Sequence, residues 1–161
     1  MIKLFKKYVF TFISLLKGCK YQVKPNVYGF SLFTKGTTLG KNTNFNGFRV
    51  YGGGTISIGD NFHSGKNCKV ITQVHNYHGS SLPYDDTYLT KDIVIGDNVW
   101  FGMDVTILSS CHIGEGAIIQ AGSVIVNDIP PLAIAGGNPA KVFKYRDKEH
   151  YYSLKSLSNN G

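Results

Sequence analysis

Residues 93–125 read IVIGDN VWFGMD VTILSS CHIGEG AIIQAG SVI when they are divided into groups of six. The third position of each group is a large apolar residue, from Ile95 through Phe101 to Ile125. The first position is small or medium-sized and mostly apolar, from Ile93 to Ser123. A six-residue period fits neither an α-helix nor an amphipathic strand. It predicts a solenoid whose coils have three short sides, each with one large side chain in the interior.

The same period is present upstream, although less regularly. The large positions there are Leu39, Phe45, Tyr51, Ile58, Ser64 and Val70. The phase slips by one residue between Tyr51 and Ile58, and again after Val70. Glycine follows several large positions, and we expect these glycines at corners where a positive φ is needed. Segments 39–71 and 92–127 together predict about four coils.

Composition narrows the class of protein. The 161 residues suffice for one domain, and the net charge is +7. Without a basic stripe or zinc spacing, we expect no nucleic-acid partner. Ten Tyr and ten Phe predict faces that pack against a partner subunit or a flat ligand. The three scattered cysteines favour a reducing, cytoplasmic compartment, and the inward register of Cys68 and Cys111 favours core filling over a nucleophilic role.

The two ends are expected to be helical. Residues 1–25 form an amphipathic N-terminal segment, residues 26–145 the solenoid, and residues 146–161 a C-terminal helix and tail. The N-terminal apolar core is too short to span a bilayer, and no cleavage site follows it. Two interpretations remain: packing on the domain, or peripheral contact of residues 1–21 with an anionic membrane, at the inner face of the bacterial membrane. Pro130-Pro131 and Pro139 are expected to end the repeat, because proline cannot donate to a ladder.

Between residues 74 and 92 the period gives way to a long, polar and aromatic segment. Such insertions are usually functional when they are ordered. His75 stands where this loop begins, and an imidazole can take a proton from a hydroxyl near neutral pH. His78 is a second candidate, as a base or a substrate contact, and two histidines are too few for a zinc site. Asp85 and Asp86 are candidates to orient an imidazole, or are simply solvated.

The chain resembles the hexapeptide-repeat acyltransferases. The resemblance is carried by three blocks, residues 95–102 (IGDNVWFG), 119–131 (IQAGSVIVNDIPP) and 135–142 (AGGNPAKV). It implies an all-β solenoid, a left-handed parallel β-helix of triangular coils. An N-terminal helix, one extended loop at about residues 75–92 and a short C-terminal helix complete it. The handedness comes from the resemblance, since a left-handed crossover departs from the usual rule.

The resemblance also implies a site. In the similar galactoside, maltose and nodulation-factor acetyltransferases, a histidine opens a loop at a matching distance from the flanking repeats, which implies His75 as general base. Acetyl-CoA is then the co-substrate, no metal is required, and homotrimers carry active sites between neighbouring solenoids. The implied CoA-binding residues are Gly102, Met103, Ala121, Gly122, Val126, Asn127, Lys141 and Lys144. The implied acceptor-binding residues are Asn46, Tyr77, His78, Tyr84 and Asp85.

One departure concerns the CoA phosphates. Relatives often carry Thr-Lys where this chain has Val126-Asn127, so phosphate binding is assigned to Lys141 and Lys144, whose ammonium groups suit phosphates. Backbone amides near Gly102 are expected to hold the oxyanion.

The expected reaction is acetyl transfer from acetyl-CoA to a sugar hydroxyl. The short, basic chain with an apolar N-terminal helix resembles enzymes that O-acetylate bacterial surface polysaccharides (O-antigen, capsule or exopolysaccharide) or their precursors. An antibiotic acetyltransferase and a non-catalytic β-helix scaffold stay open as alternatives. A carbonic anhydrase of this fold needs three zinc-binding histidines, and the loop offers only His75 and His78.

Overall fold

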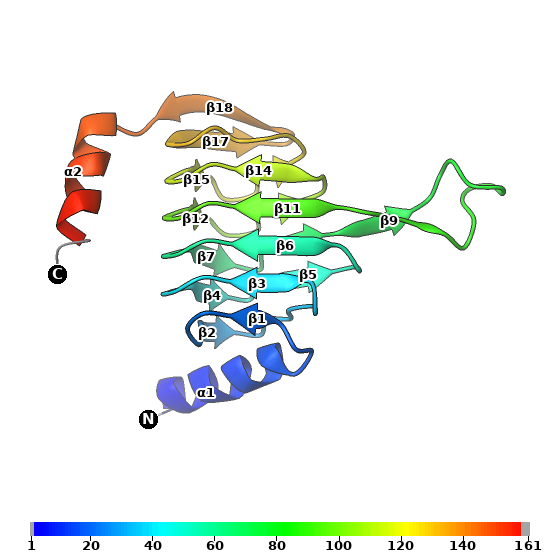
Figure 1. The fold of residues 1–161 in the computed structure, drawn as a ribbon, viewed down its shortest axis with the longest axis horizontal. Helices are drawn as coiled ribbons and strands as arrows, with labels where there is room; N and C mark the ends of the chain where they lie inside the picture. The colour runs from blue at the N-terminus through cyan, green and yellow to red at the C-terminus, as the bar shows by residue number, and fades with distance from the viewer. Residues whose placement is uncertain (1, 159–161) are drawn as a thin grey trace.

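A computed structural model describes residues 2–158 of the chain. Residue 1 of the predicted N-terminal segment and residues 159–161 of the predicted C-terminal one therefore lie outside the described residues. The chain winds as a parallel β-solenoid, with helix α1 (Ile2–Leu15) across one end and helix α2 (Lys148–Ser158) beside the other (Figure 1). The predicted solenoid with two terminal helices is confirmed.

Three sheets run along the solenoid, and each coil visits them in the order A, B, C. Sheet A contains β1 (Lys20–Tyr21), β3 (Thr37–Leu39), β6 (Thr55–Ile58), β11 (Asp92–Ile95) and β14 (Cys111–Ile113). Sheet B contains β2 (Asn26–Gly29), β4 (Asn44–Asn46), β7 (His63–Lys66), β12 (Trp100–Phe101), β15 (Ile118–Ile119), β17 (Ala133–Gly137) and, antiparallel at its edge, β18 (Ala140–Tyr145). Sheet C contains β5 (Arg49–Tyr51), β8 (Lys69–Ile71), β13 (Thr106–Ile107) and β16 (Val124–Ile125). The turns between sheets form three corner rows, called here the A–B, B–C and C–A corners.

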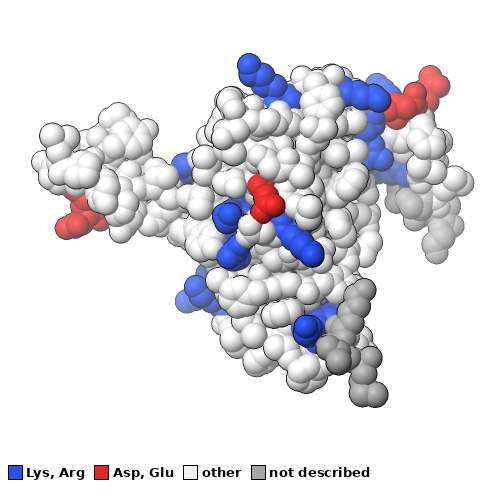
Figure 2. Space-filling view, turned by 180° about the vertical axis from the view of Figure 1, so that it is seen from behind, with Lys and Arg blue, Asp and Glu red and all other residues white. Residues whose placement is uncertain are grey.

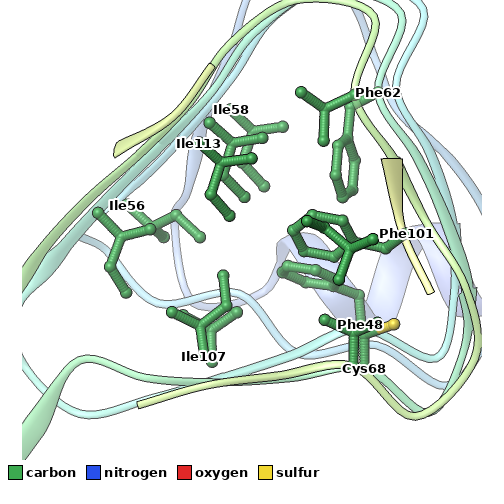
Figure 3. Packing of buried hydrophobic residues seen from close by; sticks show 14 of the residues in the cluster. Phe48, Ile56, Ile58, Phe62, Cys68, Phe101, Ile107 and Ile113 are labelled. Carbon is green, nitrogen blue, oxygen red and sulfur yellow. The ribbon is translucent and has the colours of Figure 1, made fainter. Parts of the chain in front are cut away.

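The interior is filled from all three sides, as the six-residue period requires. Ile95, Phe101 and Ile107 are fully buried, and Figure 3 shows that the interior side chains point toward one another. Five of the ten phenylalanines belong to this core: Phe33, Phe45, Phe48, Phe62 and Phe101. Neighbouring rings in this set lie 4.9–6.4 Å apart, at angles typical of favourable aromatic pairs. The expectation that phenylalanine marks faces for partners or ligands was therefore wrong for half of these residues.

The corner chemistry differs from the prediction. The glycine after the large residue does not adopt a positive φ; instead, a Cβ on Gly96 would lie 2.8 Å from the backbone nitrogen of Glu115 in the next coil. Glycine is needed there because the coils stack closely. The positive φ comes two residues later, at Asn98 (58°) and Gly116 (70°) for example, and asparagine tolerates this conformation better than most residues. At the A–B corner the Asn61 side chain donates to Asn98 Oδ1 at 3.0 Å, linking successive coils.

The solenoid extends beyond the predicted four coils. Sheet B holds six parallel strands, because a rung at β2 precedes the predicted coils and another at β17 follows them. The repeat therefore continues past Pro130-Pro131, contrary to expectation, and its last parallel strand ends at Gly137, shortly before Pro139. Upstream, Phe33 and Val27 are buried six and twelve residues before Leu39, so the signal was present in the sequence.

One inward residue was assigned to the wrong position. Tyr51 is 40% exposed, and its neighbour Val50 is buried instead. The register of β4 shifts between Asn44 and Asn46, so the phase already changes before residue 50, and it changes again between Val50 and Ile58, which are eight residues apart. Cys68 and Cys111 are buried as predicted, and desolvation raises the pKa of each thiol to about 11, which keeps both thiols protonated near neutral pH.

The two helices close the ends differently. Thr11 and Ser14 of α1 are buried, and Phe10 and Leu15 pack against the core. Helix α2 begins at Lys148, two residues later than predicted, with Asp147 Oδ1 accepting a bond from the His150 amide at 2.7 Å as a cap. No helix within residues 2–158 is long and apolar enough to cross a membrane.

Candidate active site

The segment that interrupts the repeat is a two-stranded antiparallel ribbon, called here the arm (residues 73–90). Strands β9 (Gln73–His75) and β10 (Tyr88–Thr90) pair with His75 opposite Tyr88, and the arm projects from the C–A corner (Figure 1). At its base the Lys91 amide donates to the Thr72 carbonyl at 2.8 Å. The arm is therefore an insertion whose two ends meet.

His75 is held between two aromatic rings. Its imidazole stacks on Tyr84 with a centroid distance of 3.8 Å and an interplanar angle of 16°, and Tyr88 lies 4.8 Å away on a tilt. The Nδ1 atom is buried and has no hydrogen-bond partner within the described chain. Ring packing, rather than a carboxylate, therefore sets the orientation of this imidazole.

Asp85 organises the tip of the arm. Its carboxylate accepts bonds from the Thr87 hydroxyl at 2.5 Å, the Thr87 amide at 2.9 Å, and the amide and hydroxyl of Ser80 at 2.9 and 3.4 Å. These bonds, that of the Thr87 hydroxyl foremost, lower the pKa of Asp85 to about 2. Within the described residues, the hydrogen bonds of the Asp85 carboxylate therefore come from Ser80 and Thr87 and not from an imidazole.

The other predicted acceptor contacts on the arm face solvent. Tyr77 is 65% exposed, and its ring lies 4.4 Å from that of His78. The backbone amide of His78 donates to Asn76 Oδ1 at 3.0 Å. Within residues 2–158, no three His, Cys, Asp or Glu side chains are grouped so that they could hold a metal ion.

Four of the predicted CoA-binding residues line up at the B–C corner. Gly102 and Met103 follow β12, Ala121 and Gly122 follow β15, and the Gly122 amide donates to the Met103 carbonyl at 2.8 Å. Met103 and Ala121 are exposed, so they present a surface for a ligand. The Gly102 amide donates to the Ile119 carbonyl at 2.8 Å, so an oxyanion contact from the predicted amides near Gly102 has to come from a neighbour of this one.

The remaining CoA-binding candidates are elsewhere. Val126 and Asn127 follow β16 and lie at the C–A corner. Lys141 and Lys144 are exposed on β18, a strand that the sequence analysis did not predict, opposite Gly136 and Ile134 of β17. Strands β17 and β18 form an antiparallel hairpin, which thus carries both ammonium groups at the end of sheet B.

Asn46 lies at the B–C corner, where its side-chain amide nitrogen, Nδ2, donates to the Ser64 carbonyl at 2.9 Å. It borders a groove whose lining includes Tyr28, Arg49 and Lys66. Sequence reasoning missed these three residues. They belong to coils whose hexad pattern is imperfect. Tyr28 and Lys66 lie on β2 and β7 of sheet B, whereas Arg49 begins β5 of sheet C, so the groove forms where these strands meet at the B–C corner.

Within one chain, the candidate residues thus occupy two separate corners. His75 and Asn127 belong to the C–A corner, whereas Asn46, Met103 and Ala121 belong to the B–C corner. Sheet C separates the two corners, and a side of five or six residues spans roughly 15–20 Å. The arm therefore does not form a closed site with the B–C corner of its own chain.

Comparison with known proteins fits this geometry. The bacterial transferase hexapeptide model, of six repeats, matches residues 92–127. Over 137 residues the chain is 34% identical to galactoside O-acetyltransferase of Escherichia coli K12, a match that covers 81% of this chain. The chain is therefore homologous to galactoside O-acetyltransferase over most of its own length, and residues 92–127 match the hexapeptide repeat. Hexapeptide repeats indicate a left-handed β-helix, as predicted from the resemblance.

Solved structures of similar proteins agree with the solenoid. A hexapeptide-repeat acetyltransferase of Vibrio cholerae, complexed with acetyl-CoA, superposes with a TM-score of 0.62 at 31% identity, over 73% of this chain and 64% of that one. A galactoside acetyltransferase in complex with coenzyme A gives a TM-score of 0.64 at 28% identity, over 82% and 66%. The chain spans 64% of the length of the Escherichia coli protein and 45% of a fission-yeast relative.

Proposed function

We propose that the protein is an acetyl-CoA-dependent O-acetyltransferase that modifies a sugar hydroxyl, with His75 as its general base. The observation that carries the proposal is a histidine held by two tyrosines on an arm that interrupts a hexapeptide solenoid. Relatives of the chain are named acetyltransferases, and two of their structures hold acetyl-CoA or coenzyme A. The surface polysaccharides of bacteria, or their precursors, are the proposed acceptors.

In the proposed mechanism, Nε2 of His75 receives the proton, since Nδ1 is buried. The acceptor hydroxyl loses its proton to Nε2 while its oxygen attacks the thioester carbonyl of acetyl-CoA. The tetrahedral intermediate then collapses, the C–S bond breaks, and the imidazolium returns the proton to the departing thiolate. Stacking on Tyr84 fixes the ring plane before the substrate arrives, which reduces the entropic cost of the attack.

We propose that the working unit is a homotrimer whose sites lie between chains. The arm of one chain extends outward from its C–A corner, and the predicted ligand-facing residues Met103 and Ala121 lie on a different corner. A head-to-tail contact around a three-fold axis brings the arm of one chain to the B–C corner of the next, three times over. Such a contact completes a site that a single chain leaves divided.

The proposed ligand positions follow from that arrangement. The pantetheine arm of acetyl-CoA runs past Gly102, Met103, Ala121 and Gly122, and continues to Val126 and Asn127. Lys141 and Lys144 bind its phosphates. Asn46 and the arm residues Tyr77, His78, Tyr84 and Asp85 border the acceptor, with the Asp85 carboxylate shaping the arm. The cytoplasm, which keeps cysteines such as Cys19 reduced, is the proposed compartment.

The test is a thiol-release assay with the purified chain and acetyl-CoA, against a panel of galactosides, acidic and neutral glycans, aminoglycosides and chloramphenicol. We expect release with a glycan, and a loss of about 10²–10⁴-fold in kcat for His75→Ala, the usual contribution of a general base. His150→Ala, which removes an exposed imidazole from α2, is the matched control and retains most of the activity. Transfer only to an antibiotic would overturn the sugar acceptor, and full turnover by His75→Ala would overturn the base.

A further inference from the structure

Helix α1 has a second apolar face that nothing in the described chain covers. Its outward residues are Phe5, Tyr8, Val9 and Phe12, and Leu16, in the turn that directly follows the helix, continues their spacing of i, i+3, i+4, i+7 and i+11. Phe5 is 70% exposed and Phe12 is 67% exposed. The spacing places all five on one side of the helix.

The solenoid does not need this face. The inward side of α1 already covers the first rung, with Thr11 and Ser14 buried and Phe10 and Leu15 against the core. A contiguous exposed apolar stripe of this kind usually marks an interaction surface. The outward stripe is therefore a docking surface that is independent of the end-capping role.

Charge indicates what docks there. Residues 1–59 contain eight lysines and one arginine and no Asp or Glu, whereas residues 60–161 contain eight basic and ten acidic residues. Lys6, Lys17, Lys20 and Lys24 are exposed at this end. Figure 2 shows blue but no red side chains around the lower end of the solenoid, the end that α1 covers in Figure 1.

We propose that α1 docks the protein on the surface of a bilayer that contains anionic phospholipid. The helix lies in the interfacial plane, with Phe5 and Phe12 among the acyl chains and the lysines against the headgroups. A second copy of the chain is a poorer occupant, because it would bring two uniformly cationic ends together. Because α1 crosses the end of the solenoid, the coils then rise from the membrane, and the arm extends to the side.

The test is co-sedimentation of the full chain with large vesicles of phosphatidylcholine alone or with 30 mol% phosphatidylglycerol, a composition on the order of the anionic content that attracts polybasic surfaces. The test variant is Phe5→Gln/Phe12→Gln. The matched control is Leu154→Gln/Leu157→Gln, which removes two apolar side chains, 50% and 71% exposed, from α2 at the opposite end. Neither variant changes the net charge.

We expect binding to the anionic vesicles only, weakened by salt. The α1 variant should lower the partition coefficient by about tenfold or more, since it loses the two aromatic side chains that insert among the acyl chains. The α2 variant should bind like the wild type, and circular dichroism should show both variants folded. Absence of binding to anionic vesicles, or an equal loss in both variants, overturns the proposal. So does a change in sedimentation mass caused only by the α1 variant, which would assign the stripe to contact between copies.

Discussion

The B–C corner and the C–A corner are made from the same coils but in opposite ways. At the B–C corner the residues of successive coils bond directly, as Gly122 does to Met103, and close stacking leaves no room for a Cβ at Gly102. At the C–A corner the coil opens into the arm, whose tip is held by the bonds of one carboxylate and whose histidine is held by two rings. One corner is a product of the repeat, and the other is an exception to it.

The difference separates two physical tasks. Binding a long, extended ligand needs a regular, rigid surface, which stacked coils supply without special residues. Positioning a base needs a specific environment for one side chain, which a six-residue period cannot create at a single place. Under the proposed function, the repeat binds acetyl-CoA and the interruption performs the proton transfer.

The largest expected effect comes from separating the two corners genetically. His75→Ala removes the base, and Ala121→Trp blocks the exposed B–C corner. Each variant alone should be nearly inactive in thiol release. Co-expressed and purified through two different tags, mixed trimers should regain about a third of wild-type activity, because in a head-to-tail ring each mixed trimer has one interface of three that pairs an intact arm with an intact corner. Mixed trimers that stay inactive, with their composition verified by native mass spectrometry, would place both corners in one chain's site.

A smaller effect concerns the stacking at the B–C corner. A Cβ on Gly102 would lie 2.5 Å from the Ala121 backbone nitrogen, so Gly102→Ala should lower the free energy of unfolding by about 1–3 kcal/mol. Gly122→Ala is the control: nothing lies within 4 Å of its Cβ, and only its φ of 73° is unfavourable, at about 1 kcal/mol. Urea denaturation of both variants measures the difference. Equal losses would mean that coil spacing adapts to the extra methyl group.

The smallest effect is the titration of the arm. The pKa of Asp85 is lowered to about 2, below the usual value of about 3.9. The stabilisation that the ionised Asp85 carboxylate gives the arm is therefore fully present above about pH 4 and is lost as the pH falls toward 2. In NMR spectra, the Ser80 and Thr87 amide resonances should titrate with a midpoint near 2 in the wild type and in Asp86→Asn. Asp85→Asn should abolish this transition; its persistence there would assign the titration to another group.

Much of the solenoid is predictable because one local rule is repeated. Ile95, Phe101 and Ile107 could be placed in the interior from spacing alone. Tyr51 could not, because its phase depends on the irregular pairing of β4 with β7, which is a contact between coils. The position of His75 at the root of an insertion was likewise readable, since the loss of the period marks the insertion.

The details of the site were less predictable because they depend on contacts across the chain. Asp85 was a candidate to orient an imidazole, but its hydrogen bonds come from Ser80 and Thr87, which fold back on it. Amides near Gly102 were expected to hold an oxyanion, but that of Gly102 itself pairs with the next coil. Lys66 approaches Asn46 through the stacking of β4 on β7, and Arg49 through the turn from sheet B to sheet C.

The hydrogen bond between the Lys91 amide and the Thr72 carbonyl has a consequence for the evolution of such a protein. It closes the solenoid as though residues 73–90 were absent, so a longer, shorter or differently composed arm can be exchanged without disturbing the coils on either side. Under the proposed function, a change of acceptor then requires changes in the arm only, and the solenoid can stay the same.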